Sequence, residues 1–158
     1  MTKNDYYLIK ATRAKELYDK GLPFVKVYAT VRDGDNFIVL EKHKDGKIIY
    51  DLSGGGVDDN ESLEDAIKRE LREELKVEVD IIKKLGIYDK FYLTWELNGE
   101  KFDVQYEIHV FDTVLKKQLK GKKGLDGEFD KDTKIVHIDK STLLSEVAEF
   151  RDFGFKLD

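Results

Sequence analysis

The 158-residue sequence contains no cysteine, which excludes disulfide bonds, thiolate metal sites and cysteine nucleophiles. It has no apolar run long enough to span a membrane, and residues 1–7 contain no apolar signal region. We therefore expect a cytoplasmic protein with no membrane partner. The net charge of −5 lacks the basic excess of a typical nucleic-acid binder, so nucleic acid is not the expected partner.

The composition is that of a folded domain rather than a disordered chain. Hydrophobic residues make up 41% of the chain, charged residues 39% and aromatic residues 11%. A chain of 158 residues is long enough to bury a substantial core but short for two domains, so we expect one domain over residues 1–158. The sequence leaves the oligomeric state open, a homodimer included.

The pattern of apolar residues predicts strands on both sides of one central helix. Asp33-Gly34 and Asn98-Gly99 are typical of tight turns between strands. We expect an α/β (α+β) fold, namely an α/β/α sandwich on a mixed β-sheet. The predicted strands are residues 24–31, 37–41, 47–52, 77–85, 91–97, 102–111 and 134–138, and the predicted helices are residues 13–20, a central helix capped by Ser62, and residues 141–150.

A glycine-rich segment leads into the central helix. Gly54, Gly55 and Gly56 follow a short predicted strand, and their lack of side chains allows the backbone to approach a phosphate group or a metal ion closely. In the helix that follows, apolar residues recur at helical spacing and form a stripe that would anchor it to the core. These residues are Leu63, Ala66, Ile67, Leu71 and Leu75.

The same helix carries three clustered carboxylates, Glu70, Glu73 and Glu74. Residues three and four apart share a helical face, and two like charges about 4 Å apart repel by roughly 4 kcal/mol at an effective dielectric near 20. Arg69 can pair with Glu73, but Glu70 and Glu74 have no basic residue at helical spacing. The alternative is an exposed, charged helix face, but such a face would alternate acidic and basic residues along its whole length. The cluster therefore predicts a hard cation, Mg²⁺ or Mn²⁺.

The spacing reads Gly, five residues, Glu, seven residues, then Arg-Glu-aliphatic-any-Glu-Glu-any-any-aliphatic, and it resembles the Nudix box between Gly55 and Val77. The matching positions are Gly55, Glu61, Arg69, Glu70, Leu71, Glu73, Glu74 and Val77. One position departs from the pattern, because Lys76 stands where the family usually has glycine. That departure concerns the turn at the end of the helix, where a left-handed residue is least costly as glycine.

This resemblance implies metal-dependent hydrolysis of a diphosphate linkage in a nucleoside diphosphate joined to another moiety. It assigns Glu70, Glu73 and Glu74 as the catalytic metal ligands for Mg²⁺ or Mn²⁺, with the backbone carbonyl of Gly54 as a further ligand. It also implies that Glu61 and Arg69 brace the glycine loop, including Gly55, against the helix. The partner would then be a nucleotide-type small molecule.

Two roles are less closely tied to the motif. Some relatives take their general base from an acidic residue on a late loop, which points to Glu128 here, although a box glutamate is the alternative. Tyr92 and Trp95, in an aromatic segment after the box, are the predicted substrate-binding residues, since their rings can stack on a base. The competing interpretation of the whole chain is a non-catalytic Nudix-like module that binds a nucleotide or a protein partner.

Overall fold

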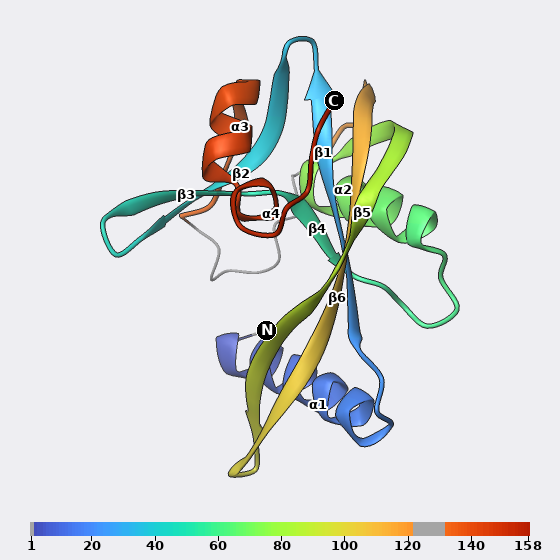
Figure 1. Ribbon diagram of the computed structural model, residues 1–158, viewed down its shortest axis with the longest axis vertical. Helices are drawn as coiled ribbons and strands as arrows, with labels where there is room; N and C mark the ends of the chain where they lie inside the picture. Colours follow the sequence, from blue (N-terminus) through green and yellow to red (C-terminus); the bar gives the residue numbers. More distant parts are fainter. Residues whose placement is uncertain (1, 122–131) are drawn as a thin grey trace.

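The computed structural model describes residues 2–121 and 132–158 (Figure 1). Its helices are α1 (Lys3–Asp19), α2 (Leu63–Leu75), α3 (Lys140–Glu146) and α4 (Ala148–Arg151). Its strands are β1 (Phe24–Asp33), β2 (Asn36–Lys44), β3 (Lys47–Asp51), β4 (Ser53–Gly56), β5 (Val77–Leu97), β6 (Glu100–Gln118) and β7 (Lys134–Ile138).

One mixed sheet organises these elements, as the sequence predicts. The strand order is β3-β2-β1-β6-β5, with β4 paired to β1 and β7 paired to β2. Strands β1 and β6 run parallel, whereas the other pairs are antiparallel. Helix α2 packs against one face of the sheet, and α1, α3 and α4 contribute to the apolar cluster on the other face (Figure 1). This arrangement confirms the predicted sandwich.

The predicted apolar stripe of α2 holds this helix to the sheet. Ala66, Ile67, Leu71 and Leu75 are at most 1% exposed, and they share one cluster with residues of β1, β2, β5 and β6, such as Phe111. Burying four such side chains contributes several kcal/mol at about 25 cal/mol per Å² of apolar area. The charged face of α2 is thereby turned away from this cluster, toward β4 at one side.

Strands β5 and β6 form a long twisted hairpin that extends past the rest of the sheet (Figure 1). Its turn is Asn98-Gly99, and both residues have positive φ, as a tight hairpin turn requires. The prediction of separate strands at 77–85 and 91–97 is wrong. Four irregularities in the pairing interrupt the alternation of the side chains, but the chain remains paired with β6 across them.

The ends of the chain also differ from the prediction. Helix α1 begins at Lys3 rather than near residue 13, because Thr2 and Asp5 form a capping box at its start. The helix predicted over 141–150 is divided into α3 and α4 at Val147, which adopts an extended conformation. The glycine segment forms strand β4, which pairs with β1 through Gly54, Gly55 and Gly56.

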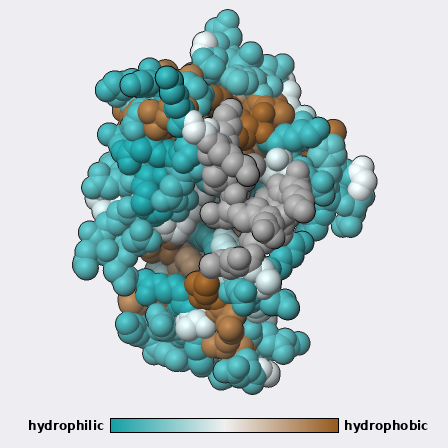
Figure 2. Space-filling view, turned by 180° about the vertical axis from the view of Figure 1, so that it is seen from behind, coloured by the Kyte–Doolittle hydropathy of each residue, from teal (hydrophilic) through white to brown (hydrophobic). Residues whose placement is uncertain are grey.

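The surface is largely hydrophilic on the face seen in Figure 2, with apolar residues in small separate patches. Among the helices that the structure describes, none combines the length and the apolar character needed to cross a membrane.

Candidate active site

Helix α2 is capped at both ends, and these caps set where its acidic residues lie. The Ser62 hydroxyl accepts a hydrogen bond from the Asp65 N–H at 3.1 Å, which confirms the predicted cap. At the other end Lys76 is left-handed, with φ of 54°. Its carbonyl accepts hydrogen bonds from the Leu119 N–H at 2.7 Å and the Gln118 side chain at 2.8 Å. A lysine is thus held in a conformation that glycine adopts more easily.

Arg69 joins the helix to the segment that precedes it. Its guanidinium donates to both carboxylate oxygens of Glu61, at 2.8 and 3.0 Å, and to the Gly56 carbonyl at 2.9 Å. Glu61 in turn accepts the Asp58 N–H at 3.0 Å. The paired Glu61 raises the pKa of Arg69, and the arginine lowers the pKa of Glu61. Both groups therefore stay charged at neutral pH and fix the loop between β4 and α2.

The strand β4 runs so close to β1 and α2 that side chains would not fit there. A Cβ at Gly54 would lie 1.9 Å from the Val27 carbonyl oxygen, and a Cβ at Gly55 would lie 2.5 Å from the Glu70 carboxylate. Glu74 is tied to the same strand, because its Oε1 accepts the Ser53 hydroxyl and the Gly54 N–H, both at 2.9 Å. Two of the box carboxylates thus lie directly against glycine backbone.

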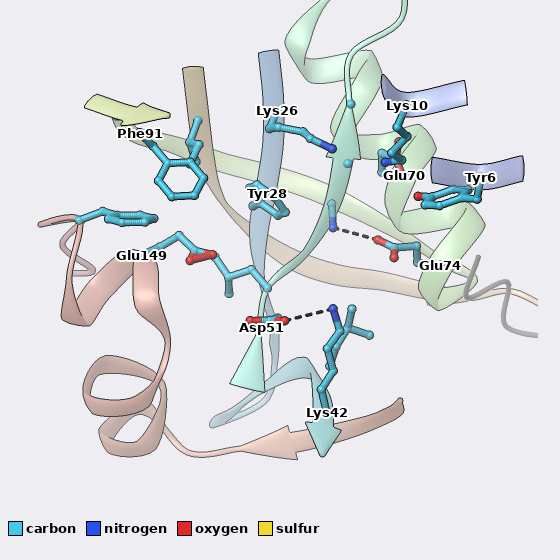
Figure 3. A pocket seen from close by; sticks show the side chains of 17 residues that line it. Tyr6, Lys10, Lys26, Tyr28, Lys42, Asp51, Glu70, Glu74, Phe91 and Glu149 are labelled. Atoms are coloured by element: carbon cyan, nitrogen blue, oxygen red, sulfur yellow. Dashed lines mark hydrogen bonds and ion pairs between the residues drawn. The ribbon is translucent and has the colours of Figure 1, made fainter. Parts of the chain in front are cut away.

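These residues form one wall of a cavity of about 450 Å³ (Figure 3). Elements far apart in the sequence build the remaining walls, from α1 at the N-terminus to α4 near the C-terminus. The lining residues are Tyr6, Lys10, Lys26, Tyr28, Leu40, Lys42, Asp51, Leu52, Gly54, Gly55, Gly56, Glu70, Glu74, Phe91, Ile108, Glu149 and Phe153.

The three carboxylates of the predicted metal site are not equivalent. Glu70 and Glu74 line the cavity, whereas the Glu73 side chain is 54% exposed and lies 3.4 Å from Arg69. At 3.6 residues per turn, Glu74 lies about 40° from Glu70 on one side and Glu73 about 60° from Glu70 on the other. The packing of α2 turns the Glu70–Glu74 side of this arc toward the cavity. In residues 2–121 and 132–158, no three Asp, Glu or His side chains come together as a preformed metal site.

The cavity carboxylates also have basic neighbours that the sequence argument missed. Arg69 Nη1 lies 3.0 Å from Glu70 Oε1, although the two residues are adjacent in sequence. The Lys26 amine, from β1, is attracted electrostatically to the carboxylates of both Glu70 and Glu74. The premise that Glu70 and Glu74 lack compensating charge is therefore wrong, because helical spacing ignores partners from adjacent residues and from other elements.

Lys26 stands out as a charged residue within a buried strand. The pKa of this amine is lowered to about 8, mainly by burial and also by the neighbouring amine of Lys10, against the opposing attraction of Glu70 and Glu74. The Lys26 amine lies 5.0 Å from the centre of the Phe24 ring, and the Lys10 amine lies 4.9 Å from the centre of the Tyr6 ring. Both cations are thus supported by aromatic faces at the cavity wall.

The opposite end of the cavity is aromatic and contains a second buried acid. The rings of Phe91 and Phe153 lie 5.8 Å apart there. The pKa of Glu149 is raised to about 7, mainly by burial and also by the charge of Asp51, against the lowering effect of a backbone hydrogen bond. Asp51 itself pairs with Lys42 at 3.1 Å. Figure 3 shows Glu149 on the far side of Tyr28 from Glu74, so the two acidic groups occupy different ends of the cavity.

Comparison with known proteins connects this arrangement to a family. The model of the NUDIX domain matches residues 22–151, which is most of the chain. The chain belongs to the Nudix family. The Nudix box predicted between Gly55 and Val77 falls inside the matched range, and helix α1 lies before it.

Individual relatives of this Nudix protein are distant. The low-salt glycan biosynthesis protein Agl8 of Haloferax volcanii is 33% identical over 79 residues, which cover 49% of this chain and 51% of Agl8. The chain thus matches about half the length of that curated relative. A NUDIX hydrolase from Nitrosomonas europaea superposes with a TM-score of 0.55 at 20% identity, covering 78% of this chain and 77% of that one. A MutT protein from Methanosarcina mazei Go1 superposes with a TM-score of 0.54 at 23% identity, covering 83% and 90%. At these identities the two structures show a shared fold.

The donor groups on the Nudix wall of the cavity fit a hard cation. Glu70 and Glu74 offer carboxylate oxygens, and these carboxylates lie against the backbone of Gly55 and Gly54, which line the same cavity. Oxygen donors of this kind are those that Mg²⁺ and Mn²⁺ prefer. The Gly54 carbonyl remains a predicted metal ligand. Glu73 is also a predicted metal ligand, but its side chain is exposed and does not line the cavity.

The structure places the other predicted site residues as follows. Tyr92 is 59% exposed on the hairpin, and Trp95 packs against Tyr7 and donates to the Tyr106 hydroxyl at 3.0 Å. Neither residue lines the cavity, because Tyr92 points to the other face of the strand and Trp95 lies farther along the hairpin, beneath α1. Phe91 is the aromatic residue of this segment that reaches the cavity. Glu128 lies outside the described residues.

Sequence reasoning missed Lys26, Lys10 and Glu149. For Lys26 a signal was present, since it alternates with Phe24 and Tyr28 on one face of an apolar strand, where an unpaired lysine would be costly. Glu149 likewise interrupts an apolar pattern near Phe150. No local pattern identifies Lys10, because its place in the cavity depends on how α1 packs.

Proposed function

We propose that this protein is a metal-dependent hydrolase that cleaves a diphosphate, or phosphoanhydride, linkage in a nucleoside diphosphate joined to another moiety. Membership of the Nudix family supports hydrolysis of such compounds in general. The observation that carries the proposal is the pairing of Glu70 and Glu74 with bare glycine backbone on one wall of a cavity of about 450 Å³. That volume suits a small molecule of nucleotide size, which we propose as a cytoplasmic substrate.

In this proposal Glu70 and Glu74 hold the metal, and Gly54 and Glu73 are further predicted ligands. Bound Mg²⁺ or Mn²⁺ supplies screening of the phosphate charge and a more acidic water. The contribution of Ser53 is positional, because its hydroxyl and the adjacent N–H hold Glu74 in one orientation. Fixed orientation matters, since a displacement of about 1 Å in a catalytic group can lower the rate roughly 10²-fold.

Arg69 and Glu61 brace the site rather than react. Their paired hydrogen bonds hold the loop between β4 and α2, and Arg69 also contacts Glu70 directly. A bidentate arginine–carboxylate pair supplies directional stiffness that a lysine would not. We therefore place both residues outside the reacting atoms, as supports for the carboxylates.

The general base in this proposal is Glu128 or one of the box glutamates. The phosphate portion of the substrate lies toward Glu70 and Glu74, and the group attached to the diphosphate lies toward Phe91 and Phe153. Tyr92 and Trp95 remain the sequence-based proposal for contacts with the substrate outside this cavity. The glycan-biosynthesis name of the Haloferax relative makes sugar nucleotides a reasonable class to include among test compounds.

The test is product analysis with a panel of nucleoside diphosphate derivatives, dinucleoside polyphosphates and nucleoside triphosphates, each with Mg²⁺, with Mn²⁺ and with chelator. We expect release of a nucleoside monophosphate from the preferred compound in the presence of metal only. Absence of hydrolysis across the panel by a folded protein that binds metal would favour the alternative, a non-catalytic nucleotide- or partner-binding Nudix module.

A further inference from the structure

Two lysines from separate elements meet at the wall of the cavity. Lys10 comes from α1 and Lys26 from β1, both line the cavity, and the charge of Lys10 acts on the Lys26 amine. Each amine lies about 5 Å from an aromatic ring, that of Tyr6 or Phe24. Figure 3 shows both lysines reaching toward the part of the cavity formed by β4 and α2. Two neighbouring cations repel each other, so the arrangement requires negative charge nearby.

In the protein alone, that negative charge comes from the carboxylates of the Nudix box. Glu70 and Glu74 both attract Lys26, and all four side chains line the same cavity. A divalent cation held by Glu70 and Glu74 would neutralise these carboxylates. The lysines would then face added positive charge, and the cavity would require an anion to restore the balance.

A diphosphate matches that requirement in charge and shape. Its two phosphorus atoms carry several negative oxygens, so one side can face the metal while the other faces a pair of ammonium groups. We propose that Lys10 and Lys26 bind the diphosphate of the substrate, and that α1 is therefore part of the substrate-binding site. This inference rests on the proposed diphosphate substrate, and it adds two residues that the Nudix box does not contain.

Helix α1 contributes residues to the cavity although it lies outside the part of the chain that matches the family model. The helix precedes residue 22, where the match to the family model begins, yet it supplies Lys10 and Tyr6 to the cavity. It is fastened to the β5–β6 hairpin by the Tyr7–Trp95 ring contact and by the ion pair of Lys15 with Glu100 at 3.1 Å. The anion-binding wall of this chain is thus completed by a segment outside the Nudix box.

The test measures binding of methylenediphosphonate, a diphosphate that cannot be hydrolysed, by isothermal titration calorimetry. The variants are Lys10→Met, Lys26→Met and, as a control at the C-cap of α1, Lys20→Met, whose side chain is exposed and does not line the cavity. With Mg²⁺ present we expect each cavity variant to bind at least tenfold more weakly, the control to bind normally and Lys10→Arg to recover most of the affinity. For the unmodified protein we expect removal of Mg²⁺ to weaken binding by at least tenfold.

The competing explanation is that Lys10 only tethers α1 to α2. In that case Lys10→Met would lower the melting temperature but bind methylenediphosphonate with normal affinity, which would overturn the inference. If Lys26→Met does not fold, Lys10→Met decides alone, since Lys10 is only partly buried.

The outcome also separates this inference from the proposed reaction. Lysine-dependent binding without hydrolysis of any test compound would contradict the reaction and support the inference. Metal-dependent hydrolysis with an unchanged KM in Lys10→Met would support the reaction and contradict the inference.

Discussion

Adjacent glycines in β4 should respond to alanine in opposite ways. Both have backbone angles that alanine can adopt, since neither has positive φ. The added Cβ meets backbone at Gly54, with the Val27 oxygen at 1.9 Å and the Tyr28 Cα at 2.8 Å. At Gly55 the nearest atoms are those of the Glu70 carboxylate, the end of a flexible side chain, at 2.5 Å. The first contact forces strands β1 and β4 apart, whereas the second displaces one carboxylate.

The expected magnitudes follow from these contacts. Gly54→Ala should lower the free energy of unfolding by about 3 kcal/mol, the upper range for overpacking a well-packed site. Gly55→Ala should change that free energy by less than about 1 kcal/mol, because the restricted unfolded chain offsets part of the strain. It should nevertheless lower kcat roughly 10²-fold or more, because an ordinary Cβ contact of 3.4 Å or more requires the Glu70 carboxylate to move by about 1 Å.

Urea unfolding and steady-state hydrolysis of the same two variants provide the assay. The matched pair removes the ambiguity of a single substitution, since both change glycine to alanine in one strand. Two results would refute the reasoning: equal destabilisation by the two substitutions, or a normal hydrolysis rate in Gly55→Ala.

Three further predictions concern the groups around the cavity. Arg69→Met should lower the free energy of unfolding by about 2–4 kcal/mol, because it leaves the Glu61 carboxylate without its partner. The control is Arg72→Met, which removes an exposed ion pair. If urea unfolding shows that Arg69→Met loses no more stability than Arg72→Met, the prediction is contradicted. Glu149 has a pKa of about 7 in the folded protein, against 4.5 for an unperturbed glutamate, so the folded state binds its proton more tightly than the unfolded state. The free energy of unfolding therefore decreases by up to about 3 kcal/mol as the pH rises from 4.5 through 7. Asp51, Tyr28, Arg151 and Asp152 are the titratable neighbours. Glutamine does not titrate, so urea unfolding should show that Glu149→Gln gains stability relative to the unmodified protein on going from pH 5 to pH 8. A stability difference between the two proteins that does not change with pH would refute this prediction. Lys76→Gly should raise the free energy of unfolding by about 0.5–1 kcal/mol and leave hydrolysis unchanged, because it removes the strain of a lysine in the left-handed conformation. A lower melting temperature in the variant would count against that explanation.

Local sequence signals predicted the parts of the site that lie within one segment. The Ser62 cap, the apolar stripe ending at Leu75 and the Asn98-Gly99 turn each depend on residues a few positions apart, and all three appear in the structure. These features are determined by helical spacing and turn chemistry, which a single sequence displays directly. Arg69 and Glu61 form an ion pair in the structure, and their bracing role, implied by the resemblance to the Nudix box, stays a prediction.

Features that depend on packing between distant segments were not predictable in this way. Lys26, which Glu70 and Glu74 attract, comes from β1, and no spacing rule relates it to the box. The alternation that defines strands fails at the bulges of β5, so one long strand was predicted as two. Likewise, the helical wheel places Glu73 near Glu70, but only the packed helix shows that Glu73 faces solvent.

The most direct test of the account is nucleotide release by the Glu74→Gln variant beside the unmodified protein, with Mg²⁺ and with chelator. Glutamine keeps the oxygen that accepts the Ser53 and Gly54 hydrogen bonds, so the fold should remain intact while the negative charge is lost. The account predicts metal-dependent hydrolysis by the unmodified protein and a rate lower by several orders of magnitude in the variant. A folded Glu74→Gln protein that hydrolyses the same substrate at a near-normal rate would contradict it.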